Sequence, residues 1–140
     1  ARVTPSPALS LSSTVAVADA DRVSYHAAAV IASNHLVALL GQVERVAATI
    51  GVPLEAYLAL VRGTVDNVAA LGPAAALTGP VSRGDWDTVR RHLRALPPDE
   101  RGAYLSMAAE AARLAGREPP PWPAGDGPPG QGHAGPPDAG

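Results

Sequence analysis

The chain of 140 residues contains no cysteine and no phenylalanine, and all 11 of its basic residues are arginines. The lack of cysteine excludes disulfides, thiol chemistry and cysteine metal sites. The lack of lysine excludes a Schiff-base or P-loop lysine within this segment. A formal net charge of -2 argues against nucleic acid as the main partner. Neither His35 nor His133 has a partner at metal-ligand spacing, so no metal site is expected.

Long hydrophobic runs are also missing. None approaches the ~20 apolar residues that a membrane span needs. The closest run, residues 27–40, is interrupted by Ser33, Asn34 and His35. The serine-rich stretch at residues 8–20 does not have the composition of a signal peptide. We therefore expect a soluble, cytoplasmic domain that makes no membrane contact.

Helical patterns bounded by glycine and proline fill the middle of the chain. The first runs from Asp19 or Asp21 to Ile50 and stops at Gly51. Because its middle is apolar on nearly all sides, we expect it to be a long central helix covered by the others. Three more helices are predicted: from Pro53 to Gly72, from Asp85 to Pro97, and from Asp99 to Gly116.

The second and fourth of these helices each show one apolar face at helical spacing, so the sequence predicts an all-α bundle of about four helices. The apolar stripe of the second helix is Leu54, Leu58, Val61, Val65 and Val68. The third helix includes Trp86, Val89, His92 and Leu93. In the fourth helix one face is shared by Tyr104, Met107, Ala108, Ala111 and Leu114.

The two ends of the chain differ in composition from the helical middle. We expect residues 1–18 to be a linker from a preceding domain and residues 19–116 to be the helical domain. Of the last 24 residues, 14 are Pro or Gly, which predicts a disordered tail at 117–140. Residues 130–135 match the G-x-G-x-x-G dinucleotide fingerprint in letters, but they lack the strand and helix that give the fingerprint its meaning.

A first polar segment, residues 25–34, lies within the long apolar helix. On an ideal α-helix His26 and Ser33 share a face, and Asn34 lies some 80° round. A ligand along the helix could meet an imidazole that donates a proton, a hydroxyl and an amide. Alternatively, Ser33 bonds back to a helix carbonyl and Asn34 bridges to a neighbouring helix.

Asn67 and Thr64 form a smaller polar pair on the second predicted helix. They could face Asn34 across a helix pair, either as a buried polar contact or as part of a ligand site.

A second polar segment, residues 76–85, precedes the third predicted helix. Thr78, Gly79 and Arg83 offer backbone N–H groups and a guanidinium, which suit a carboxylate or phosphate. Alternatively the segment is a structured turn in which Ser82 or Asp85 caps the helix and Arg83 pairs with an acid. His92, beside Arg90, Arg91 and Arg94, is interpreted as part of a solvated basic face.

These two polar segments resemble one known family, the C-terminal helical domain of Rossmann-like oxidoreductases called domain of unknown function 2520. The resemblance covers about residues 19–115 and rests on two blocks that agree in order and spacing. They are Tyr25-His26-Ala27-Ala28-Ala29-Val30 with Ala32-Ser33-Asn34, and Ala76-Leu77-Thr78-Gly79-Pro80 with Arg83-Gly84-Asp85, Thr88 and His92.

The resemblance implies a two-domain protein in which an N-terminal Rossmann domain, absent from this chain, binds NADP or NAD. This segment would then be the helical substrate-binding and dimerisation domain, similar to that of 6-phosphogluconate dehydrogenase, and the substrate a small oxo acid or imine. His26 and Asn34 are the expected catalytic residues. Substrate binding is expected from Ser33, Asn67, Thr78, Gly79 and Arg83.

Related hydroxyacid dehydrogenases carry a Lys one turn before the Asn, where this chain has Val30. The sequence therefore leaves a second function open, a non-catalytic dimerisation module of a nucleotide-sensing Rossmann protein. A free-standing helical adaptor that works through its proline-rich tail is a third hypothesis.

Overall fold

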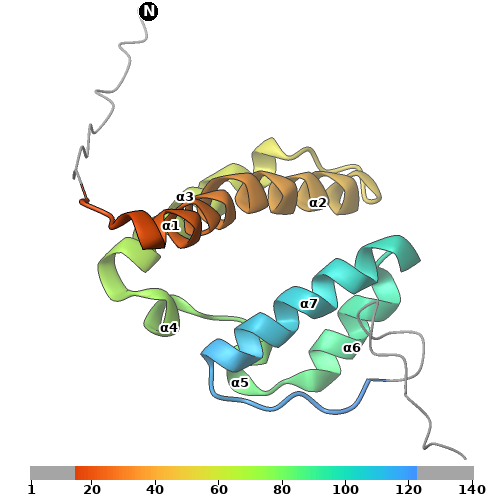
Figure 1. Cartoon of the computed structure of the whole chain (residues 1–140). Helices are drawn as coiled ribbons and strands as arrows, with labels where there is room; N and C mark the ends of the chain where they lie inside the picture. The colour runs from red at the N-terminus through yellow and green to blue at the C-terminus, as the bar shows by residue number, and fades with distance from the viewer. Residues whose placement is uncertain (1–14, 123–140) are drawn as a thin grey trace, which may run out of the picture. The chain divides into compact units, whose positions relative to one another are not determined.

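The computed structural model describes residues 15–122, and all regular structure within that range is helical (Figure 1). The predicted all-α class is therefore confirmed. Residues 1–14 and 123–140, which hold most of the expected linker and tail and the glycine-rich 130–135 sequence, lie outside the described residues. The chain separates into two compact units, Ala1–Leu39 and Leu40–Gly140.

The four predicted helices begin and end close to the predicted positions, and two further short helices form at residues 73–83, where a loop or turn was predicted. The helical elements in chain order are the 3₁₀ turn η1 (Asp19–Asp21), α1 (Arg22–Val30), the π-helix η2 (Ile31–His35), α2 (Leu36–Ala48), α3 (Glu55–Leu71), α4 (Pro73–Ala76), α5 (Pro80–Arg83), α6 (Trp86–Ala95) and α7 (Pro98–Leu114).

Glycine and proline set these boundaries for physical reasons. Gly72 has φ 79° and ends α3, and Gly84 has φ 69° and ends α5, both in a region that disfavours residues with a Cβ. Proline occupies the first turn of α4, α5 and α7, where its missing N–H costs no helical hydrogen bond.

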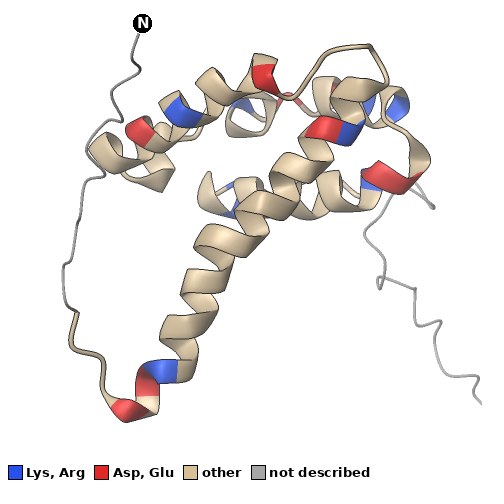
Figure 2. Cartoon of the chain, turned by 90° about the horizontal axis from the view of Figure 1, so that it is seen from above, with Lys and Arg blue, Asp and Glu red and all other residues tan. Residues whose placement is uncertain are grey.

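The described part of the first unit is one helix preceded by a short extended segment. The helix continues into the second unit, so that Asp19–Ala48 forms a single 30-residue run. In Figure 2 the ribbon of this run carries no Lys, Arg, Asp or Glu between Arg22 and Glu44. By length and composition this run could span a membrane, because Ser33, Asn34 and His35 interrupt it without adding a charge. A core helix of a soluble protein or a signal sequence meets the same criterion, so the expected absence of membrane contact stays a prediction.

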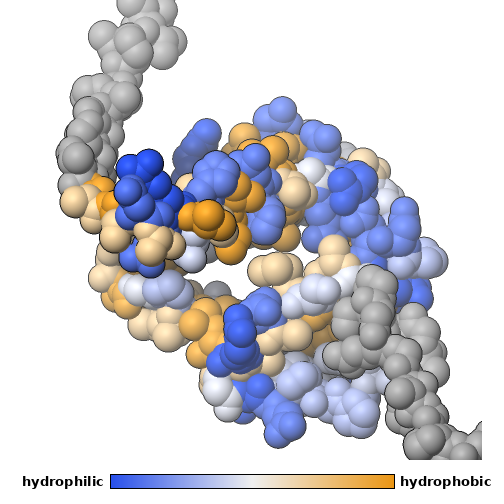
Figure 3. All heavy atoms as spheres, viewed as in Figure 1, coloured by the Kyte–Doolittle hydropathy of each residue, from blue (hydrophilic) through white to orange (hydrophobic). Residues whose placement is uncertain are grey.

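Among the residues of the first unit that the structure describes, the expected cover over the middle of this helix is not found. α1 and η2 contain no buried residue. Val23 is 81% exposed and Val37 is 70% exposed, and Figure 3 shows apolar side chains open at the surface. Within the described part of the first unit there is no second helix to pack against.

The core of the second unit lies between α5, α6 and α7. Its buried residues are Val81, Val89, Leu93, Leu105, Ala108 and Ala112. Asp85 begins α6 by accepting a hydrogen bond from the backbone N–H of Thr88 at 3.1 Å, so the predicted cap is confirmed.

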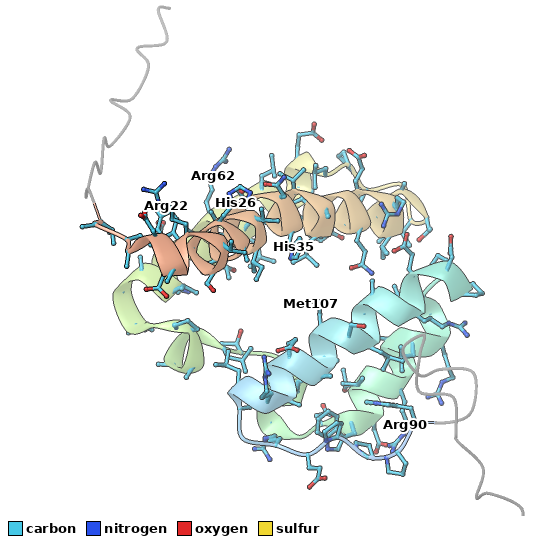
Figure 4. The ribbon with its side chains drawn as sticks, in the orientation of Figure 1. Arg22, His26, His35, Arg62, Arg90 and Met107 are labelled. Atoms are coloured by element: carbon cyan, nitrogen blue, oxygen red, sulfur yellow. The ribbon has the colours of Figure 1, made fainter. Side chains whose placement is uncertain are left out.

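The buried face of α7 differs from the predicted one. Leu105, Ala108 and Ala112 are buried, whereas Met107 is 49% exposed and Leu114 is 43% exposed. Figure 4 shows Met107 projecting from α7. The two candidate faces have similar hydrophobicity in an alanine-rich helix, so tertiary packing decides between them.

The stripe of α3 is likewise only partly covered. Leu54, Leu58 and Val61 are half-buried, while Val65 and Val68 are exposed. α3 contributes no buried residue to the core of the second unit.

The chain beyond α7 also packs on this core. Arg117 donates through Nε to the backbone oxygen of Ser82 at 2.8 Å. The ring of Trp122 meets that of Trp86 edge-on, with centroids 6.2 Å apart. The packed structure therefore extends to Trp122, past the domain boundary expected at residue 116.

Candidate functional site

The first polar segment coincides with the π-helix η2. Ser33 and Asn34 both lie in Ile31–His35, where the helix widens. Single π turns inside α-helices occur frequently at functional sites. Because a π turn has more residues per turn than an α-helix, the 100° spacing used to align His26 with Ser33 does not hold across it.

The structure brings Ser33 and Asn34 together. The Ser33 hydroxyl lies 2.8 Å from the backbone oxygen of Ala29 and 2.8 Å from Oδ1 of Asn34, and its single proton can serve one of them at a time. The back-bond to Ala29 is the structural alternative predicted for Ser33. Both side chains are exposed. The contact therefore orders the pair and leaves it open to a ligand.

His26 lies on α1 and is exposed. His26 and His35 extend from opposite sides of the helix (Figure 4). His26 makes no side-chain hydrogen bond or ion pair within residues 15–122, so its imidazole is available as a donor or acceptor.

Asn67, on α3, is exposed and makes no side-chain hydrogen bond within the described residues. Its neighbour Thr64 donates to the backbone oxygen of Leu60 at 2.8 Å. Thr64 is thus satisfied within its own helix, while the amide of Asn67 is open.

The second polar segment begins at the last residue of the short helix α4 and contains the short helix α5 with the turns beside it. Thr78 is exposed, and Gly79 has φ 94°, which turns the chain into Pro80 at the start of α5. Ser82 donates to the backbone oxygen of Gly79 at 2.7 Å and so holds this turn closed. Ser82 therefore does not cap α6, and Asp85 does.

Arg83 is the last residue of α5, and it is exposed. In the described part of the chain it has no ion-pair partner, so the predicted pairing with an acid is not found there. Its guanidinium is available to an anion, whereas the Asp85 carboxylate accepts hydrogen bonds from Thr88. Two hydrogen bonds from Thr88, one from its side chain and one from its backbone, lower the pKa of Asp85.

Sequence reasoning missed a pair of facing side chains in the second unit. Nδ1 of His92 on α6 lies 2.7 Å from the Tyr104 hydroxyl on α7, and the two rings meet edge-on at 5.9 Å. Burial raises the pKa of Tyr104. The three arginines near His92 in sequence predicted a solvated face, and only the packing of α6 on α7 reveals its tyrosine partner.

A second missed interaction is an ion pair between Arg45 and Glu100. Nε of Arg45 donates to Oε1 of Glu100, and a second donation joins the guanidinium to Oε2 at 3.2 Å. Glu100 is 5% exposed, the most buried charged residue in the described chain. Its pKa is lowered first by the hydrogen bond from Arg45, although burial acts in the opposite direction.

The fold and these exposed polar groups define an all-α domain of the helical-bundle class with two candidate binding segments. A family model, domain of unknown function (DUF2520), matches residues 8–111. Because that match covers well over half of the chain, the protein belongs to the DUF2520 family. No curated protein and no solved structure matches the sequence.

Proposed function

We propose that this chain is the substrate-binding and dimerisation domain of an NAD(P)-dependent oxidoreductase that acts on a small oxo acid or imine. The observation that carries the proposal is the π-helix, which presents Ser33 and Asn34 on a helix without charged residues for more than five turns. Membership of the DUF2520 family supports the proposal, because the resemblance to that family implied an N-terminal Rossmann domain in the same protein.

The residues divide into two chemical roles. His26 would donate a hydrogen bond or proton to a carbonyl oxygen, and the Ser33–Asn34 pair would orient that oxygen or an amide of the nucleotide. Arg83 would hold the carboxylate of an oxo acid in a charge-assisted pair, helped by Thr78 and Gly79. Asn67 would provide a further amide contact.

Residues 15–122 do not provide a site of the Rossmann type for NADP or NAD. A dinucleotide site of the Rossmann type needs a strand, a glycine-rich turn and a helix, and residues 15–122 contain no strand. NADP or NAD would therefore be bound by an N-terminal Rossmann domain of the same protein, and this chain alone would be inactive.

Dimerisation is proposed from the exposed apolar side chains. On the long helix Val23, Ile31 and Val37 are each more than half exposed, and on α3 Leu60 and Leu71 are as well. Burying such side chains is favourable by about 25 cal/mol for each Å² removed from water. We propose that a second copy covers them in a soluble, cytoplasmic homodimer.

Sedimentation equilibrium tests the dimer, with Val37→Glu as the disrupting variant and Ala103→Glu on α7 as the control. The proposal expects a dimer for the wild type and the control and a monomer for Val37→Glu. Flotation of the wild type with phosphatidylcholine vesicles, in place of a dimer in solution, would refute it and favour a membrane.

The enzymatic part is tested by calorimetric titration of NADPH and NADH into the protein together with its proposed Rossmann domain. The titration is repeated with a panel of small oxo acids, for the wild type, His26→Ala and Arg83→Ala. An oxo acid that tightens nucleotide binding in the wild type alone supports the proposal. Equal nucleotide binding in all three proteins, with no coupling to any acid, would contradict it.

One observation favours the second candidate function, a non-catalytic dimerisation module. The Ser33 hydroxyl is within hydrogen-bonding distance of the Ala29 carbonyl, as expected for a residue with a structural role. In that case the His26→Ala and Arg83→Ala variants would keep full nucleotide binding.

A further inference from the structure

The second unit contains a cavity of about 680 Å³ bounded by α2, α3, α6 and α7. Most of its wall is apolar, and no Asp, Glu or Arg of the described chain lines it. This volume lies within the range of small-molecule sites, which are mainly apolar with a few placed polar groups. The apolar lining consists of Val43, Val46, Ala47, Ile50, Ala95 and Leu96.

Two of the polar residues in the wall each donate a hydrogen bond to a backbone oxygen. The Gln42 amide donates to the backbone oxygen of Glu100 at 3.1 Å. The Thr49 hydroxyl donates to the backbone oxygen of Val46 at 2.7 Å. The other polar groups in the wall belong to three rings, those of Tyr57, His92 and Tyr104.

The hydrogen bond between His92 and Tyr104 leaves one donor free in either arrangement of its proton. If the Tyr104 hydroxyl donates to Nδ1, the neutral imidazole carries its proton on Nε2. If Nδ1 donates instead, the Tyr104 hydroxyl keeps a proton of its own. The neutral pair therefore offers a hydrogen bond to an acceptor such as a carbonyl oxygen.

We propose that this cavity binds a small, uncharged, ring-containing ketone, whose ring packs on the apolar wall and whose carbonyl oxygen accepts from the His92–Tyr104 pair. Within the described residues the wall contains no arginine to pair with a carboxylate, so an uncharged ligand is favoured over an anion. The aromatic residues favour a ring, which they can meet edge-on or stacked. Because burial raises the pKa of Tyr104, its hydroxyl stays protonated at neutral pH.

This site is independent of the proposed oxidoreductase function. None of the seven residues assigned to that function lines the cavity. Binding here is measured on this chain without nucleotide, so either proposal can fail while the other stands.

The test uses two probes with the same carbon skeleton, indan-1-one and indane, titrated into the 140-residue chain. Binding is followed by NMR through the ring signals of Tyr57, which lines the cavity and is unchanged in every variant. One neutral hydrogen bond should make the ketone bind roughly fivefold more tightly than the hydrocarbon. The double variant His92→Phe/Tyr104→Phe keeps the rings and should bring that preference close to one.

Ala95→Trp should fill the cavity and abolish binding of both probes, whereas Ala103→Trp, on the exposed side of α7, should leave binding unchanged. If Ala95→Trp does not fold, the double phenylalanine variant still decides the role of the pair. Equal binding of ketone and hydrocarbon to the wild type would overturn the proposal. So would ring signals that change with protein concentration and ignore both probes, because a second copy would then occupy the cavity.

Discussion

Arg45 on α2 and Glu100 on α7 form an ion pair across 55 positions of sequence. The Glu100 side chain is 7% exposed, while that of Arg45 is 60% exposed. Gln42, one turn before Arg45, donates to the backbone oxygen of the same Glu100. The two side chains together attach α2 to the start of α7.

Removing the Glu100 charge should destabilise the fold. Glu100→Gln loses the charge-assisted bonds from Arg45 and leaves a guanidinium without its partner, so we expect the thermal midpoint to fall by roughly 5 °C at pH 7. Circular dichroism measures the midpoint. Glu110→Gln is the control, because Glu110 pairs with Arg113 on the exposed side of α7 and its loss should change the midpoint little.

The same carboxylate should make stability depend on pH. The hydrogen bond from Arg45 lowers the pKa of Glu100 below 4.5, the value for an isolated Glu. Its stabilisation is therefore fully present above pH 4.5 and is lost as pH falls through the folded-state pKa. Unfolding by urea between pH 7 and pH 3 should show a smaller decrease for Glu100→Gln than for the wild type. Parallel decreases for the two proteins would show that Glu100 does not titrate as proposed.

Leu105 tests where the core lies on α7. Leu105→Ala should lower the free energy of unfolding by about 2–5 kcal/mol, because it leaves a cavity in the buried cluster. Leu114→Ala, the same substitution at an exposed position of that helix, should cost well under half as much. Urea denaturation measures both, and an equal loss would mean that the face predicted from sequence is buried after all.

Substitutions at Gly84 and Gly51 distinguish the cost of backbone strain from the cost of a contact with Arg117. A Cβ at Gly84 would lie 3.0 Å from a guanidinium nitrogen of Arg117, whereas one at Gly51 would have nothing within 4 Å. The φ angles, 69° and 71°, are nearly equal. Gly51→Ala and Gly84→Ala should share a strain cost of about 1–2 kcal/mol, and Gly84→Ala should cost more because Arg117 must move. In the Arg117→Ala background the difference between the two should disappear.

The positions of the main helices could be predicted from the sequence, but the tertiary contacts between them could not. Gly51, Gly72 and Pro97 mark helix ends through local backbone preferences that involve only a few residues. The predicted ends of these helices therefore agree with the structure. The back-bond of Ser33 and the cap at Asp85 are equally local, and both were among the alternatives derived from sequence.

Interactions between distant segments could not be predicted in the same way. Glu100 reads as an acidic residue in a first helical turn, and only α2 reveals that it is buried and paired. The sequence places His92 on a basic surface, and only the structure shows its contact with Tyr104. The π-helix at Ile31–His35 is also missed, because the sequence was analysed at the 100° spacing of an α-helix throughout.

The central claim is that the first polar segment binds a ligand, and calorimetry of nucleotide and oxo acid binding to Asn34→Leu tests it most directly. The protein is again studied with its proposed Rossmann domain, and Thr64→Val, whose hydroxyl bonds only within α3, is the control. The account predicts that an oxo acid tightens nucleotide binding in the wild type and in Thr64→Val but not in Asn34→Leu. Coupling of equal strength in all three proteins would contradict it and leave Ser33 and Asn34 with a structural role alone.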